Sequence, residues 1–127
     1  MEGNEYINLK DLLVYKMALE LSLCCWITFE KFDWETRKIE GIQFIRSIDS
    51  VGANIAEGYG RFHYLDRIKF YYNSRGSLLE SKHWIYLLYK RNKVSPRDYE
   101  SIIKRLNNIH IQLNGFIKSC YKSKNDD

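Results

Sequence analysis

Isolated histidines and two serines are the residues of this chain whose types could carry catalysis. The histidines are His63, His83 and His110. Glu80 precedes His83 by three residues, the spacing found in di-iron helical bundles, but such a site needs a second matching pair that the sequence lacks. Ser50 and Ser77 have no base at a spacing that would place it beside the hydroxyl. The residue types therefore predict no enzyme activity, no metal site and no cofactor.

A glycine-rich stretch, Gly58-Tyr59-Gly60-Arg61, resembles a phosphate-binding loop at first sight. A P-loop follows a strand and carries a Lys before its Ser or Thr, whereas this stretch follows a helical pattern and lacks that Lys. Glycine at the end of a helix commonly adopts the left-handed conformation that stops the helix. We therefore interpret Gly58 or Gly60 as a left-handed helix stop, followed by a turn at about 60–64.

The charge of the chain changes sign along its length. Residues 1–60 hold six Lys and Arg against ten Asp and Glu, a net charge of −4, within a total of +4. Residues 61–127 hold fourteen Lys and Arg against six Asp and Glu, a net charge of +8. A basic half can attract a phosphate backbone. It can equally pair with the acidic half, inside one bundle or between subunits, and the sequence leaves both interpretations open.

Ten basic residues are candidates for contacts to structured RNA or DNA. They are Arg61, Arg67, Lys69, Arg75, Lys82, Lys90, Arg91, Lys93, Lys104 and Arg105. Binding carried by such charges weakens steeply with salt. Exposed tyrosines and tryptophans could stack on bases, although burial in a core or interface explains most of them more simply. The alternative function is a protein-interaction scaffold that binds no nucleic acid.

Four amphipathic segments must position these candidates. They span approximately residues 9–29, 35–59, 65–91 and 96–120. Short links make successive helices antiparallel neighbours, and the single proline of the chain favours long uninterrupted helices. The sequence therefore predicts one domain, 1–127, with an all-α fold: an up-down-up-down antiparallel four-helix bundle.

Caps and apolar spacings define these helices. Asp33 or Thr36 can cap the second helix, and Ser95 followed by Pro96 begins the fourth. The apolar residues that recur along the first helix are Leu12, Tyr15, Leu19, Leu23 and Trp26. Those expected in the core from the second helix are Ile45, Ile48, Val51, Ile55 and Tyr59. Apolar and aromatic residues spread nearly all round the third helix, which indicates burial on more than one face and hence a homo-oligomer.

A stripe of specific polar residues lies opposite the apolar face of the second helix. It comprises Gln43, Arg46, Ser50, Asn54 and Glu57, within about 60° on a helical wheel. Amides mixed with small residues differ from the interchangeable Lys and Glu of a solvent face. The stripe is either a wet face or a polar seam packed against another helix or subunit. The remaining residues assigned to this seam are Gly58, Gly60, Gly76, Ser77 and Glu80.

Four motifs in order give the chain a family resemblance. They are Asp11-Leu12-Leu13-Val14-Tyr15, then Gln43 with Arg46, then Asn54 to Arg61, then Phe70 with Gly76, Ser77 and Glu80. With these motifs the chain resembles the four-helix-bundle proteins of 23S ribosomal RNA intervening sequences. It is also similar to the accessory variability proteins of diversity-generating retroelements. It departs from the pattern at Ile45, where an arginine is usual, and at Ser74, where alanine is common.

The resemblance implies a bacterial, cytoplasmic, non-enzymatic bundle that assembles into a ring-like homo-oligomer, a pentamer. In the retroelement branch it implies nucleic-acid binding and partnership with a reverse transcriptase. A cytoplasmic location also agrees with the sequence, because Cys24, Cys25 and Cys120 form no disulfide or zinc pattern. The apolar runs are too short to cross a membrane, so no membrane partner is expected.

Overall fold

The computed structural model describes residue 9 and residues 12–122, so Asp11 of the first motif lies outside the described residues. Helix α1 covers Leu13–Glu30. A short helix α2, Trp34–Thr36, runs through a π-helical turn η3, Arg37–Gly41, into α3, Ile42–Tyr59. Helices α4, Tyr64–Lys90, and α5, Pro96–Lys122, are the two longest, with 27 residues each.

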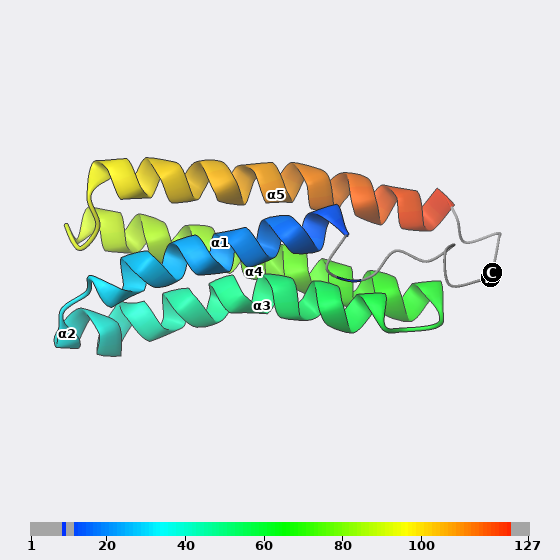
Figure 1. Cartoon of the computed structure of the whole chain (residues 1–127), viewed down its shortest axis with the longest axis horizontal. Coiled ribbons are helices and arrows are strands. Elements are labelled where there is room, and N and C mark those ends of the chain that lie inside the picture. Colours follow the sequence, from blue (N-terminus) through cyan, green and yellow to red (C-terminus); the bar gives the residue numbers. More distant parts are fainter. Residues whose placement is uncertain (1–8, 10–11, 123–127) are drawn as a thin grey trace.

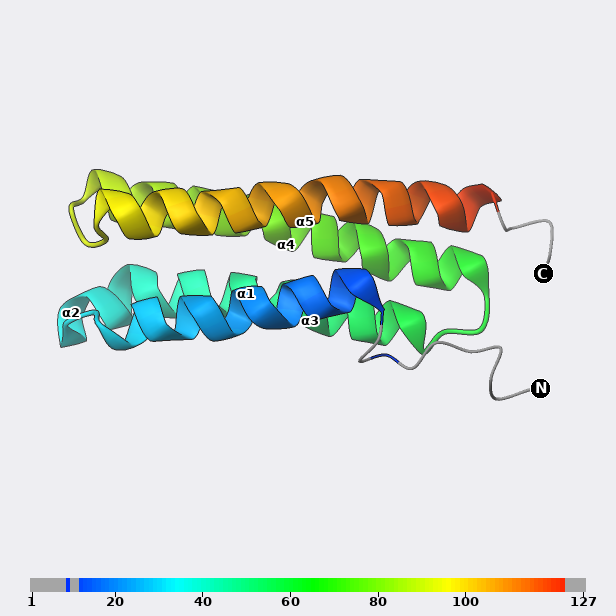
Figure 2. The ribbon, with the colours of Figure 1, turned by 45° about the horizontal axis from the view of Figure 1, so that its top comes forward.

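The four long helices form a bundle with antiparallel neighbours (Figure 1). Helix α3 packs against α1 and α4, and α5 packs against α4 and α1. Figure 2 shows α1 with α3 in one layer and α4 with α5 in the other. The described residues contain no strand. The predicted all-α four-helix bundle is confirmed, and the links α1–α2 and α4–α5 lie at one end of it, opposite the α3–α4 link (Figure 1).

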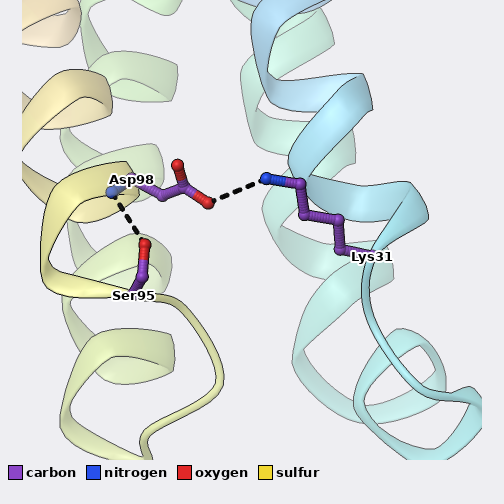
Figure 3. Close-up of polar contacts among 3 residues, drawn as sticks. All are labelled: Lys31, Ser95 and Asp98. Atoms are coloured by element: carbon purple, nitrogen blue, oxygen red, sulfur yellow. Dashed lines mark hydrogen bonds and ion pairs between the residues drawn. The ribbon is translucent and has the colours of Figure 1, made fainter.

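Side-chain caps begin two of the helices as their sequences predict. Asp33 Oδ1 accepts a hydrogen bond from the backbone N–H of Thr36 at 2.8 Å, and this bond holds the pKa of Asp33 below its ordinary range. Ser95 Oγ accepts a hydrogen bond from the backbone N–H of Asp98 at 3.0 Å, just before Pro96 enters α5 (Figure 3). The Asp98 carboxylate also lies 3.2 Å from the ammonium of Lys31, which ties the end of α1 to the start of α5.

The end of α3 differs from the predicted left-handed stop. Gly60 has φ −79° and ψ −6°, in the right-handed region, and no described glycine has a positive φ. The left-handed residue is Asn92, with φ 59°, at the end of α4. Asparagine tolerates this conformation, and the backbone N–H of Lys93 then reaches the carbonyl of Leu88 at 2.8 Å. Backbone conformation therefore gives no reason for glycine at positions 58 and 60.

The core draws one face from each long helix. Its largest fully buried side chains are Leu21, Phe44, Ile48, Ile55, Tyr71, Leu78, Ile85, Leu88, Ile102, Leu106, Ile109 and Leu113. The predicted core face of α3 is buried, with Tyr59 partly so.

Helix α1 turns a different face inward from the one its apolar spacing indicated. Leu19, Leu23 and Trp26 are exposed. The residues of α1 that face the core instead include Leu21 and Cys25. Since α1 is apolar on both sides, spacing alone does not distinguish the inner face from the outer one. Burial raises the pKa of the Cys25 thiol, which makes it a poor nucleophile.

Candidate nucleic-acid interface

The histidines lie far apart in the chain and form no common site. His63 and His83 are exposed, and His110 is partly buried on α5. Among the described residues, no three His, Cys, Asp or Glu side chains gather as metal ligands would. None of the described helices has the length and apolarity to cross a membrane.

Two cations on α4 reach neutral acceptors on α5. Arg75 Nη1 donates a hydrogen bond to Asn114 Oδ1 at 3.0 Å, and Lys82 Nζ lies 2.9 Å from His110 Nδ1. An ammonium only donates, so Nδ1 accepts and the proton of neutral His110 lies on Nε2. Burial and the two nearby cations, Lys82 and Arg75, hold the pKa of His110 below its ordinary range. Burial also lowers the pKa of Lys82.

Tyrosine contacts flank these two pairs along the same helices. The hydroxyls of Tyr72 and Tyr121 lie 3.2 Å apart, and the guanidinium of Arg75 lies 4.6 Å from the centre of the Tyr72 ring. The rings of Tyr86 and Tyr99 lie 6.3 Å apart at the other end. We name these contacts the α4–α5 ladder. Its members are Tyr72, Arg75, Lys82, Tyr86, Tyr99, His110, Asn114 and Tyr121.

The ladder cations keep their positive charge uncompensated. Within residues 12–122, neither Arg75 nor Lys82 is paired with a carboxylate, and their acceptors are an amide and an imidazole. Neutral acceptors fix the direction of a cation without cancelling its field. The two cations are therefore held in place and remain able to attract an anion.

Three other candidate cations are engaged within the bundle. Arg61 forms an ion pair with Glu57 at 2.8 Å, and Arg91 forms one with Glu40 at 3.0 Å. Arg67 donates hydrogen bonds of 3.3 and 2.6 Å to two backbone carbonyls of the α3–α4 turn. Their contacts give these arginines a structural role in the bundle.

The remaining candidates are exposed and spread over several places. Lys69 and Lys90 lie on α4, and Lys93 lies in the α4–α5 link. Lys104 lies on α5, and Arg105 lines a groove between α1 and α5. Of the ten candidates, Arg75 and Lys82 are the two that the ladder holds in defined positions.

The predicted polar seam lies on the outer face of α3 and α4. Contacts between Ser47 and Ser81 and between Val51 and Ser74 set the register of the two helices. In that register the middle of the α3 stripe lies at the same level along the bundle as the seam residues of α4. The seam members on this face are Gln43, Arg46, Ser50, Asn54, Glu57, Gly76, Ser77 and Glu80. All of them are exposed or partly exposed, so no other helix among the described residues covers the seam.

The polar contact that is packed between α3 and α4 is made by serines outside that seam. Ser81 Oγ donates to Ser47 Oγ at 3.0 Å, Ser47 Oγ donates to the carbonyl of Phe44, and Ser74 Oγ donates to the carbonyl of Val51, the last two at 2.8 Å. All three serines are buried. Ser74 stands where the family pattern commonly has alanine. A small residue at this position is the feature of the sequence that indicates close packing of α4 against α3.

A separate apolar surface lies on α1. Leu19, Leu23, Trp26 and Ile27 are exposed at helical spacing, and we name them the α1 ridge. Beside the ridge, a groove between α1 and α3 is lined largely by small residues of α3. The lining residues are Tyr15, Ala18, Leu19, Ser22, Asp49, Gly52, Ala53 and Ala56. Four neighbouring large apolar side chains in water are unusual for a surface helix and are typical of an interface.

Comparison with known proteins agrees with this architecture. Residues 10–115 match the family model described as 23S rRNA-intervening sequence protein. One similar solved structure is a protein of unknown function from the S23 ribosomal protein family of Bacteroides thetaiotaomicron. It is 27% identical with a TM-score of 0.76, over 83% of this chain and 98% of that one. No curated protein matches the chain.

The family match covers most of the chain, including all four motifs from Asp11 to Glu80. The similarity to retroelement accessory proteins stays a prediction, as do the oligomer and the nucleic-acid contacts. The matched span and the shared fold lead to one conclusion: the chain belongs to the family of 23S rRNA-intervening sequence proteins.

Proposed function

We propose that this protein is a non-enzymatic, self-assembling bundle that binds nucleic acid, RNA or DNA, through the α4–α5 side. The observation that carries the proposal is the pair of ladder cations, Arg75 and Lys82, whose hydrogen-bond partners are the neutral side chains of Asn114 and His110. Oriented, uncompensated cations on a helical surface are the usual means of holding phosphate groups.

The charge of α4 and α5 supports this assignment. Residues 64–122 hold twelve Lys and Arg against four Asp and Glu, a net charge of +8. One of the four carboxylates is compensated away from the ladder, because Asp98 pairs with Lys31 at the end of α1. The potential over this side is therefore positive, and it attracts polyanions over a Debye length of about 8 Å at physiological salt.

Removing both ladder cations tests the binding surface. The double variant Arg75→Gln/Lys82→Gln is expected to bind RNA and DNA about ten-fold more weakly at ~100 mM salt. The slope of log affinity against log salt is expected to fall by about 1.8 for duplex DNA, because each lost phosphate contact removes about 0.9. Filter binding at ~50 and ~200 mM salt measures both quantities.

The matched control is Lys16→Gln/Lys38→Gln, which removes the same charge from exposed positions of α1 and η3. It is expected to retain affinity within about two-fold, as for surface changes away from a binding site. An equal loss in both doubles would mean that net charge alone drives binding. If the unsubstituted protein retains no nucleic acid at the lower salt, the proposed function is wrong.

Self-assembly is the second part of the proposal, and the α1 ridge supports it. The double variant Leu23→Glu/Ile27→Glu is expected to dissociate the oligomer, because charges would be desolvated at the contact. Light scattering at micromolar concentration should give about 76 kDa for the unsubstituted pentamer, five times 15.2 kDa. Ile111→Glu, equally exposed but on α5, is the control and should stay assembled. If light scattering gives 15.2 kDa for the unsubstituted protein, it is a monomer and the proposed self-assembly is wrong.

A protein-interaction scaffold is the second candidate function, favoured by the same exposed α1 ridge. In that case the ridge binds a different protein. The resemblance to retroelement accessory proteins implies that this partner is a reverse transcriptase. A pull-down from the native host, repeated with Leu23→Glu/Ile27→Glu, distinguishes the two: a partner lost with the ridge and no retained nucleic acid favours the scaffold. We also assign the protein to the cytoplasm, which the spacing of its three cysteines supports, because that spacing fits neither a disulfide framework nor a zinc site.

A further inference from the structure

Resting on the proposed nucleic-acid binding, we propose that the α4–α5 ladder binds a single-stranded segment. In this arrangement the phosphates contact Arg75 and Lys82, and unpaired bases stack on Tyr72, Tyr86 and Tyr121. The inference names the form of the ligand and the residues that recognise it.

The order of residues along α4 fits an extended strand. Tyr72, Arg75, Lys82 and Tyr86 follow one another on the side facing α5, over about 21 Å at 1.5 Å per residue. The tyrosines are substantially exposed: Tyr72 38%, Tyr86 51% and Tyr121 41%. Along α4, one aromatic ring therefore precedes the pair of cations and another follows it. A basic groove lined by aromatic rings is typical of proteins that bind single strands without sequence preference.

The Tyr72 ring is prepared for stacking by its neighbours. Its hydroxyl lies 3.2 Å from that of Tyr121, and the guanidinium of Arg75 lies 4.6 Å from its ring centre. A ring and a guanidinium plane are the two surfaces on which unpaired bases commonly stack. Because these contacts already restrict the side chains, less conformational entropy is lost when a base binds.

Apolar side chains on the same surface favour unpaired bases over a duplex. Leu79 lies between Arg75 and Lys82 on α4 and is 56% exposed. Ile111 follows His110 on α5 and is 67% exposed. A duplex presents mainly phosphates and sugars, which gain nothing from contact with Leu or Ile. An unstacked base presents an apolar face, so it gains from contact with an exposed Leu or Ile side chain.

His110 gives this site a pH signature. The charged groups that face it from α4 are Lys82 and Arg75, both cationic, and its α5 neighbours Asn107 and Asn114 are neutral. In the free protein burial and these cations disfavour protonation and hold the pKa of His110 below its ordinary value of about 6.5. A bound phosphate reduces that repulsion, so the complex takes up a proton. Single-strand affinity is therefore expected to rise as pH falls from the pKa of His110 in the complex to its lower pKa in the free protein, and His110→Gln should flatten this rise.

Fluorescence anisotropy with labelled oligo(dT), oligo(U) and a duplex of equal length tests the proposal at low salt. Both single strands are expected to bind at least about ten-fold more tightly than the duplex. Tyr72→Leu/Tyr86→Leu keeps apolar volume but removes both rings, and it should weaken single-strand binding by about ten-fold or more. Trp34→Leu removes an aromatic ring that is 75% exposed at α2, and it should leave binding unchanged. Thermal melting checks that each variant remains folded.

The outcomes separate the inference from the function on which it rests. The single-strand assignment is wrong if the duplex binds as tightly as the single strands, or if the tyrosine double variant keeps its affinity while Arg75→Gln/Lys82→Gln loses it. The proposed function survives in both cases. Absence of binding to all three probes overturns the function itself.

Discussion

Gly58→Val is expected to destabilise the protein by about 3 kcal/mol, the upper end of the cost of overpacking a core. A Cβ atom at this position would lie 2.7 Å from Cε1 of Tyr71 and 3.0 Å from both the carbonyl oxygen of Arg67 and Cβ of Phe70. The carbonyl belongs to the backbone of α4, and Tyr71 is fully buried, so neither can move without separating the helices. Urea denaturation followed by circular dichroism measures the loss.

Gly76→Ala is the matched control, since it changes a glycine of the neighbouring helix where nothing lies within 4 Å of an added Cβ. It is expected to stabilise the fold by about 0.5–1 kcal/mol, the usual gain from replacing glycine inside a helix. Equal stability of Gly58→Val and the unsubstituted protein would show that α3 and α4 are not held at this close approach.

Arg91→Ala is expected to cost about 3 kcal/mol of unfolding free energy, the lower end of the range for breaking a buried ion pair. Its partner Glu40 has a side chain that is only 4% exposed, and its Oε2 lies 3.0 Å from Arg91 Nη1. Without Arg91 the buried carboxylate keeps its desolvation cost and loses its counter-charge. The half-exposed position of Arg91 is the reason for choosing the lower end.

Two further variants make this prediction specific. Lys93→Ala removes an exposed charge two residues away and should change stability by less than about 0.5 kcal/mol. Adding Glu40→Gln to Arg91→Ala should recover part of the loss, because a neutral amide is cheaper to bury than a carboxylate. If Arg91→Ala melts like the unsubstituted protein, Arg91 is available for a ligand and the structural role assigned to it is wrong.

The helices and their caps could be predicted because they depend on local sequence. Ser95 before Pro96 and Asp33 before Thr36 cap helices through side-chain contacts three residues away. The inner face of α1 could not be predicted in this way. Its outer residues, such as Leu23, follow the same helical spacing as its buried ones, and only the positions of α3 and α5 decide which side is covered.

The candidate site was predictable in type but not in detail. Arg75 and Lys82 could be named because they are basic residues in a basic half of the chain. Their partners could not, since Asn114 and His110 lie 39 and 28 residues away and depend on the register between α4 and α5. The sequence predicts a left-handed helix stop at Gly58 or Gly60, whereas Gly58 has ordinary helical backbone and is required because α4 approaches it closely.

The π-helical turn η3 gives the bundle a place where chain length can vary. A π-helical turn holds one residue more than the α-helical turn it replaces. Removing one residue from Arg37–Gly41 would leave a regular helix and keep the residues of α3 in phase with their neighbours. The same deletion inside α3 would rotate every later side chain by about 100° and carry Asn54 or Glu57 toward the core. Single-residue insertions and deletions in relatives of this chain should therefore accumulate at η3 and be excluded from α3.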